Sequence, residues 1–196
     1  ESRPPSLAGA SRYAAARIRV PDALQEPAQF EDAIARFTRD RDVDVVLPIT
    51  DASVLAVLGV RDRLGRAVVP FPTLEAFRRI SDKQVVHAEA GCVGLAVPAQ
   101  FTLATPGAVA DLDPKALAFP VVLKPFRSTV EVRGQLTKLG VSYASNEREL
   151  RARVTALPPE AFPLLLQQRI LGHGIGIFQL LWDGKLVATF AHRRLR

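Results

Sequence analysis

The sequence predicts an α/β region followed by an α+β region, and three patterns lead to this prediction. Residues 44–69 alternate an apolar run, a helical pattern and a second short apolar run, which indicates a βαβ unit with a parallel sheet. Residues 98–170 instead place several strand-like runs before a single helix, as a small α+β unit does. Beyond them, two β-rich arms flank Asp183-Gly184, a pair favoured in two-residue hairpin turns.

The first region opens with a helix and continues with a strand. The helix is predicted over residues 28–40, because Phe30, Ile34 and Phe37 recur at helical spacing on one face. The apolar run of residues 44–49 predicts a buried strand, as parallel strands usually are. A doubly wound domain normally begins with a strand and a turn ahead of such a helix, so we expect those elements to precede residue 1.

A second helix follows the strand. Thr50 or Asp51 is its predicted N-cap, and Gly65 is predicted to end it. Val68 and Val69 then suggest a short parallel strand. Asp51 lies just past a parallel strand, where open sheets bind ligands. We expect a helix cap at Asp51, with a ligand contact as the alternative.

Residues 73–92 are predicted to form a helical connector. Ser81 and Gln84 stand in the S-x-x-Q relation of a capping box, which places Lys83 in the first turn of a helix. The helix dipole and the free N–H groups of that turn favour an anion, and a lysine adds to their field. The alternative is an ordinary solvated lysine on a surface helix.

The second region contains the strands and the helix of the α+β unit. Strands are predicted near residues 99–103, 119–124 and 139–144, a helix at 147–156, and a last strand at 164–170. Asn146 and Glu149 stand in the N-x-x-E relation that caps the helix. The order of three strands, one helix and one strand therefore suggests a small α+β unit.

Lys124 is the second lysine of interest. Pro125 follows it, so Lys124 must be extended, and it projects from the same face of its strand as Val122. A lysine on an otherwise apolar face either extends its ammonium to water or has an anionic partner. The sequence leaves both interpretations open.

The composition limits the class of protein. The apolar fraction is 48% and the charged fraction 23%, which is typical of a packed domain. No apolar run approaches the roughly 20 residues of a membrane span, and no signal peptide opens the sequence. The single cysteine, Cys92, excludes an internal disulfide and is expected to be buried. We therefore expect a cytoplasmic protein with no membrane partner.

The net charge of +6 raises the question of nucleic-acid binding. Of the 26 basic residues 21 are arginines, and they are spread along the chain. A nucleic-acid binder would more often cluster its charge and interleave aromatic residues. We do not expect nucleic acid among the partners, and a basic α/β nucleic-acid-binding protein stays as an alternative.

Four stretches, taken in order, resemble the ATP-grasp superfamily, in particular its carbamoyl-phosphate-synthase-like and carboxylate–amine ligase branch. They are RDVDVVLPITDAS, ISDKQVVHAEAGCVGLAVPAQFTL, FPVVLKP and LLLQQRILGHG. The resemblance covers nearly all of the chain. It implies a partial Rossmann-like pre-ATP-grasp domain at 1–72, a helical connector at 73–92, the ATP-grasp N-terminal lobe at 93–166, and the hinge with the first hairpin of the C-terminal lobe at 167–196.

The resemblance also implies a set of ATP contacts. Lys83 and Lys124 would contact the phosphates from the first lobe. Gln167, Gln168, Arg169 and Ile170 would form the hinge, where the carbonyl of Gln168 and the amide of Ile170 are the implied partners of adenine. Ser128 would lie in the loop that covers the phosphates, although that loop is not rich in glycine as in many members of the family.

The implied reaction is the activation of a carboxylate as an acyl phosphate for attack by an amine, with release of ADP and phosphate. Arg193 and Arg194 would act in catalysis from a strand of the second lobe, since guanidinium groups suit phosphate oxygens. The family's Mg²⁺ ligands come from strands that would follow residue 196, so we expect no metal ligand here and no activity from this segment alone. A non-catalytic or regulatory ATP-binding module is the alternative within this fold.

Overall fold

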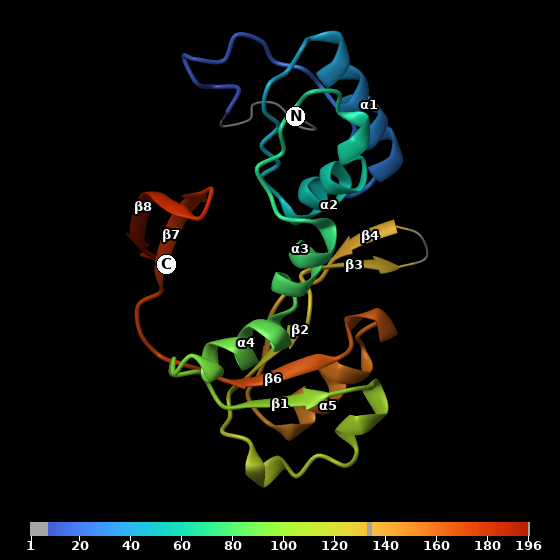
Figure 1. The fold of residues 1–196 in the computed structure, drawn as a ribbon. Helices are drawn as coiled ribbons and strands as arrows, with labels where there is room; N and C mark the ends of the chain where they lie inside the picture. The colour runs from blue at the N-terminus through green and yellow to red at the C-terminus, as the bar shows by residue number, and fades with distance from the viewer. Residues whose placement is uncertain (1–7, 133–134, 196) are drawn as a thin grey trace.

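A computed structural model describes residues 8–132 and 135–195 of the chain (Figure 1). Its α-helices are α1 (Pro27–Asp40), α2 (Asp51–Gly59), α3 (Leu74–Ile80), α4 (Lys83–Cys92) and α5 (Glu147–Thr155). Its strands are β1 (Gln100–Leu103), β2 (Val121–Pro125), β3 (Thr129–Val132), β4 (Gln135–Lys138), β5 (Ser142–Ala144), β6 (Leu164–Gln168), β7 (Ile175–Trp182) and β8 (Lys185–Arg193). Among the described residues, no helix has the length and apolar character that a membrane crossing requires.

The helices α1 and α2 form the first core. Phe30 of α1 and Val57 of α2 are buried in it, together with Leu64 from the turn that follows α2. Of the two predicted caps, Thr50 is the N-cap of α2: its hydroxyl accepts from the amide of Ser53, whose hydroxyl accepts from the amide of Thr50. Asp51 is the first helical residue, so its carboxylate stays available for other contacts.

The buried strand predicted over residues 44–49 is wrong. In this segment the structure has a single parallel bridge, between Val45 and Val68. Leu47 is 62% exposed and Ile49 is 87% exposed. A parallel strand becomes buried only when further strands and covering helices surround it, and Val68 is the one described strand-like neighbour of this run. The prediction of a short parallel element at Val68 is confirmed by the same bridge.

The connector contains two helices, and the second is capped differently from the prediction. The N-cap of α4 is Asp82, whose carboxylate accepts from the amides of Gln84 and Val85. Ser81 instead ends α3, where its hydroxyl donates to the carbonyl of Phe77. A carboxylate is a stronger acceptor at a helix N-terminus than a hydroxyl one residue earlier. Cys92, at the end of α4, is exposed rather than buried.

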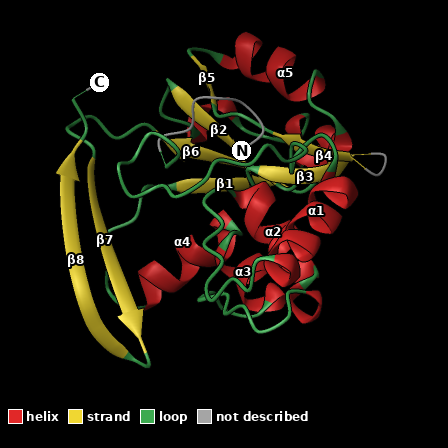
Figure 2. Ribbon diagram, turned by 90° about the horizontal axis from the view of Figure 1, so that it is seen from above, coloured by secondary structure: helices red, strands yellow, loops and turns green. Residues whose placement is uncertain are grey.

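The second core lies under a four-stranded antiparallel sheet with the strand order β1-β6-β2-β5. Leu123 of β2 and Leu164 and Leu166 of β6 point from one face of the sheet toward Leu150 and Val154 of α5. Figure 2 shows α5 and α4 on opposite sides of this sheet. The strand predicted at 139–144 is shorter than expected: β5 begins at residue 142, and residues 135–138 belong to a separate hairpin.

That separate hairpin, β3–β4, joins the two regions. Its strands pair antiparallel, with Thr129 opposite Lys138. Leu136 of β4 packs against the core formed by α1 and α2, although it lies far from that core in sequence. In Figure 1 the hairpin accordingly lies beside α2 and α3, above the main sheet.

The predicted hairpin at Asp183-Gly184 is confirmed as β7–β8. Both turn residues have positive φ, 48° at Asp183 and 72° at Gly184, as a two-residue turn of this kind requires. The residues of both strands are exposed along almost their whole length. Figures 1 and 2 show the hairpin standing apart from the main sheet at the end of an extended segment.

Candidate functional site

Lys124 and Gln167 lie on the face of the main sheet opposite α5. Strand alternation places Leu123 in the core and turns Lys124 to this second face. The Lys124 ammonium donates to Gln167 Oε1 at 2.6 Å, and Gln167 Nε2 donates to Gln100 Oε1 at 2.6 Å. Gln167 is buried, and these two bonds satisfy both ends of its amide. The chain of contacts holds the ammonium at a fixed place on the sheet.

Lys83 reaches the same neighbourhood from the first turn of α4. Its backbone amide donates to the carbonyl of Phe126 at 2.9 Å. Its ammonium donates to the hydroxyl of Ser128 at 3.0 Å. Two bonds therefore tie the start of α4 to the loop after β2, and they explain how a helix in the connector positions a cation beside that loop.

The two lysines affect one another electrostatically. Burial lowers the pKa of Lys83, Asp51 opposes this change, and the positive charge of Lys124 lowers it further. Burial also lowers the pKa of Lys124. Both ammonium groups thus lack some of the hydration that they would have in water, and an anion bound between them would compensate for it.

The predicted hinge residues lie at the end of β6. The amide of Gln168 donates to the carbonyl of Ala99 at 2.9 Å, and this is the last step of the ladder between β6 and the segment before β1. Arg169 and Ile170 are exposed beyond it. Gly172 follows with φ at 143°, a conformation that side-chain-bearing residues rarely adopt. The backbone therefore leaves the sheet just after Gln168, which is still paired with Val121 of β2.

Arg193 and Arg194 lie at the end of β8, on the exposed hairpin. The amide of Arg194 donates to the carbonyl of Gly174 at 2.7 Å, which closes the base of the hairpin. Within the described part of the chain, neither arginine side chain contacts Lys83 or Lys124 through a hydrogen bond or an ion pair. The structure thus brings together the lysines, Ser128 and Gln167, and it does not bring the two arginines to them.

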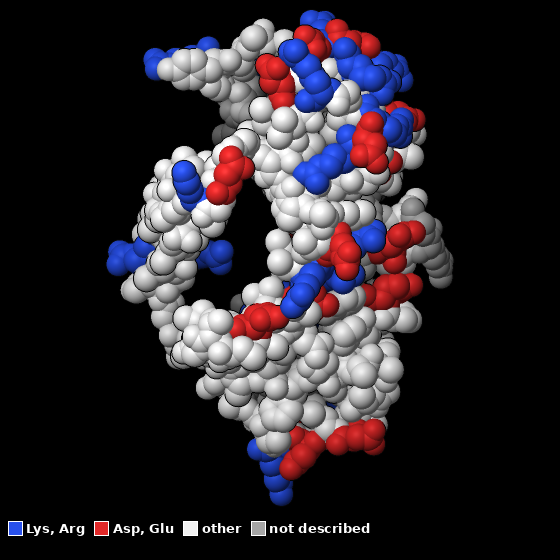
Figure 3. Space-filling model, viewed as in Figure 1, with Lys and Arg blue, Asp and Glu red and all other residues white. Residues whose placement is uncertain are grey.

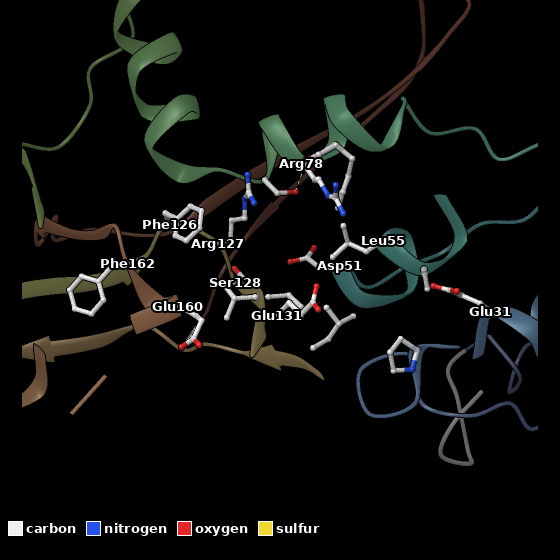
Figure 4. A pocket seen from close by; sticks show the side chains of 17 residues that line it. Glu31, Asp51, Leu55, Arg78, Phe126, Arg127, Ser128, Glu131, Glu160 and Phe162 are labelled. Atoms are coloured by element: carbon white, nitrogen blue, oxygen red, sulfur yellow. Dashed lines mark hydrogen bonds between the residues drawn. The ribbon is translucent and has the colours of Figure 1, made fainter. Parts of the chain in front are cut away.

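A cavity of about 640 Å³ lies next to this cluster, between α1, α2 and α3 on one side and the β3–β4 hairpin on the other. Ser128 lines the cavity and links it to Lys83. Figure 4 shows Arg78 and Arg127 pointing inward, opposite the carboxylates of Asp51 and Glu131. The sequence reasoning missed Arg78 and Arg127, although Arg127 directly precedes Ser128 in the loop predicted to cover phosphates.

The described residues contain no cluster of metal-ligating side chains. Over residues 8–132 and 135–195, no group of three histidine, cysteine, aspartate or glutamate side chains could hold an ion. Magnesium ions in proteins take oxygen ligands, including carboxylates and substrate phosphates. None of the described residues is assigned to Mg²⁺.

Comparison with solved structures identifies the fold. An L-amino acid ligase from Bacillus licheniformis superposes with a TM-score of 0.59 at 18% identity, over 86% of this chain and 36% of that protein. D-alanyl-alanine synthetase A from Vibrio cholerae gives 0.56 at 15% identity, over 78% and 46%. Carboxyaminoimidazole ribonucleotide synthase from Aspergillus clavatus, complexed with ATP, gives 0.54 at 16% identity, over 91% and 42%.

The resemblance to the ATP-grasp superfamily is thereby confirmed at the level of the fold, since these three structures are ATP-grasp carboxylate–amine ligases. The chain spans less than half of the length of each of them. No protein-family model matches the sequence, and no curated protein matches it either. The likeness therefore lies in the course of the backbone.

Proposed function

We propose that this chain, with its ATP-grasp fold, is the nucleotide-binding part of an ATP-dependent carboxylate–amine ligase. The observation that supports the proposal most directly is the pair Lys83 and Lys124. The two ammonium groups come from a helix start and a strand end, lie close enough for mutual repulsion, and have pKa values lowered by burial. Neither ammonium forms an ion pair with a carboxylate among the described residues, and two half-buried cations of this kind suit a polyanion such as the phosphates of ATP.

The proposed reaction uses these cations to neutralise charge. A carboxylate oxygen attacks the terminal phosphorus of ATP and ADP leaves, which yields an acyl phosphate. An amine then attacks the acyl carbon and loses a proton, and phosphate leaves. Because the charge is spread over the transferring phosphoryl group, positioned cations contribute most of the catalysis in such steps.

The remaining predicted residues receive roles around this centre. The backbone of Gln168 and Ile170 would hold adenine, and Ser128 would meet a phosphate. Arg193 and Arg194 would act after the hairpin moves toward the lysines, since closing two lobes excludes water from a reactive intermediate. The structural neighbours complexed with ATP, and with ADP and 5-aminoimidazole ribonucleotide, support nucleotide binding in this role.

Thermal unfolding with and without ATP·Mg²⁺ tests the proposal in the full-length protein. A ligand that binds only the folded state raises its melting temperature. We expect ATP to stabilise the wild type and to stabilise Lys83→Met and Lys124→Met much less. Lys138→Met, which removes an exposed lysine of β4, serves as the matched control. Equal stabilisation of all four proteins would refute the assignment of the lysines.

Two alternatives are separated by further readouts. A non-catalytic ATP-binding module would show the same stabilisation but release no ADP with any carboxylate and amine. A nucleic-acid-binding protein would instead bind DNA or RNA with steep salt dependence and show no effect of ATP. Figure 3 shows acidic and basic side chains intermingled on the face in view rather than one continuous basic surface, which favours the ligase.

A further inference from the structure

The carboxylate of Asp51 points into the cavity beside Ser128 and is not needed as the cap of its own helix. Thr50 is that cap, because its hydroxyl accepts from the amide of Ser53. Asp51 is the first residue of α2 and lines the cavity together with Ser128. Figure 4 shows its carboxylate directed toward the side of the cavity on which Ser128 lies. Within the described ranges Asp51 forms no ion pair, so its charge acts over a longer distance.

Lys83 is the cation on which this charge acts. Its ammonium donates to the hydroxyl of Ser128 at 3.0 Å, and Ser128 lines the same cavity as Asp51. Burial lowers the pKa of Lys83, and the next largest effect is that of Asp51, which raises it. The effects of Lys124, which lowers the pKa, and of Asp82, which raises it, are smaller. Asp82 is the neighbour in sequence, but its carboxylate accepts from two amides at the start of α4.

The helix dipoles explain why Lys83 needs such a partner. Lys83 is the first residue of α4, as Asp51 is of α2. The N-terminus of a helix carries a partial positive charge, which stabilises a carboxylate and destabilises an ammonium. The hydroxyl of Ser128 is neutral, so it does not offset this repulsion. The carboxylate of Asp51 does offset it, and it brings a negative charge from the first region to the cation of the connector.

The other charges around the cavity have both signs. They are Arg78 of α3, Arg127 of the loop after β2, Glu131 of β3, Glu31 of α1 and Glu160, which precedes β6. None of these described side chains is among the charges that change the pKa of Lys83. The titration of Lys83 therefore depends on Asp51, Lys124 and Asp82, and of these three Asp51 alone comes from the first region.

We infer that Asp51 is the counter-ion of Lys83 in the nucleotide-free protein, and so a positioning residue of the predicted phosphate site: its carboxylate attracts the ammonium and keeps it beside Ser128 until an anion binds. The inference rests on the proposed function only for the identity of that anion. A phosphate and Asp51 carry charge of the same sign, so a bound phosphate replaces Asp51 as the main partner of Lys83. Asp51 therefore acts on the free protein and not on the complex.

Pulse labelling of lysines in the full-length protein, without nucleotide, tests the inference. An acylating reagent reacts with the neutral amine, so the labelling rate of Lys83 rises with pH through its pKa, and mass spectrometry follows each lysine separately. We expect the midpoint of this rise to move to lower pH in Asp51→Asn, because the substitution removes a charge that raises the pKa. Lys185, which is exposed on β8, is the reference in the same sample and should label alike in all variants.

Two matched variants and a change of salt separate an electrostatic role from a structural one. Asp51→Glu keeps the charge and should restore most of the wild-type midpoint. Asp62→Asn removes an exposed carboxylate outside the cavity and should leave the midpoint unchanged. At about 1 M salt, where the screening length is about 3 Å, the difference between wild type and Asp51→Asn should shrink.

The midpoint decides the outcome. A purely structural role of Asp51 would change the amount of label on Lys83 without moving the midpoint, and an unmoved midpoint in Asp51→Asn overturns the inference. If Asp51→Asn fails to fold, Asp51→Ser replaces it.

The same labelling with ATP·Mg²⁺ tests the proposed function separately. We expect the nucleotide to slow the labelling of Lys83 and to abolish the difference between wild type and Asp51→Asn. A moved midpoint without protection by ATP would keep Asp51 as the counter-ion and refute the phosphate site. Protection by ATP with equal midpoints in the free proteins would do the reverse. A difference that persists at saturating ATP would show that Asp51 stays the main partner of Lys83, contrary to the inference.

Discussion

The ammonium of Lys124 donates to the side-chain carbonyl of Gln167 across two neighbouring strands at 2.6 Å. Because Gln167 Nε2 donates to Gln100 in turn, the amide cannot rotate without breaking one of the two bonds. The pairing of β2 with β6 therefore fixes the direction of a cation that is predicted to meet ATP. This relationship predicts that Gln167 matters for nucleotide binding although its own side chain is buried.

Gln167→Leu is expected to weaken ATP binding about 10-fold or more, since a hydrogen bond to a charged group contributes about 1.5–3 kcal/mol. Isothermal titration calorimetry with ATP·Mg²⁺ measures the change. Gln135→Leu, at an exposed position of β4, is the control for replacing a glutamine by leucine in a strand. Unchanged affinity in Gln167→Leu would show that Lys124 does not depend on this bond.

The lowered pKa values of Lys83 and Lys124 predict proton uptake on ATP binding. In the free protein, burial penalises the charged lysines, so stability rises as pH increases from the lowered folded pKa toward the ordinary lysine value. Bound phosphates favour the charged forms and raise both pKa values. ATP affinity should therefore fall as pH rises through the alkaline range in which the free lysines lose their protons.

Calorimetry in two buffers with different ionisation enthalpies counts these protons. We expect no net uptake near neutral pH and a measurable uptake at alkaline pH, reduced in Lys83→Met. A proton count that stays at zero in both ranges would mean that neither lysine meets the phosphates.

The N-cap of α4 gives a prediction about stability. Asp82→Ala should lower the free energy of unfolding by about 1 kcal/mol, because it removes the acceptor for two amides of the first turn. Ser81→Ala should have a smaller effect, since its hydroxyl only back-bonds to the carbonyl of Phe77. Urea denaturation measures the loss of unfolding free energy in each variant and so shows which loss is larger. The capping box read from the sequence predicts the opposite order.

The exposure of residues 44–49 predicts that a leucine in this segment contributes much less to stability than a leucine of the second core. Leu164→Ala, in the second core, should lower the free energy of unfolding by about 2–5 kcal/mol, because Leu164 is fully buried. Leu47→Ala should change it by no more than about 0.5 kcal/mol, since that side chain is largely exposed. Thermal denaturation compares them. A large effect at Leu47 would show that this run is buried in solution.

Local patterns predicted those elements whose structure depends on neighbouring residues. The helical spacing of Phe30, Ile34 and Phe37 predicted α1, the Asn146 cap predicted the start of α5, and Asp183-Gly184 predicted the final turn. In each case the signal and the structure lie within one or two turns of chain.

Patterns that depend on distant residues were predicted less well. The run at 44–49 is apolar enough for a buried strand, but its burial depends on strands that would flank it. Lys83, Lys124, Ser128 and Gln167 were all predicted as ATP contacts. The bonds that join each lysine to its partner were not predicted, because they follow from the docking of α4 on a loop and from strand register. Arg127 was missed although it directly precedes Ser128 in the predicted loop, because the sequence does not show that its Nε is buried.

The exposure of both faces of β7–β8 has a consequence for amide hydrogen exchange. A two-stranded hairpin with both faces exposed opens at a small cost, whatever its ladder of hydrogen bonds. Its amides, such as that of Phe178, should exchange within the time of local opening. The amides of β6, between two strands and above α5, should exchange only when the sheet unfolds. Hydrogen exchange should therefore show two levels of amide protection, a high level in β6 before Gly172 and a low level in β7–β8 after it.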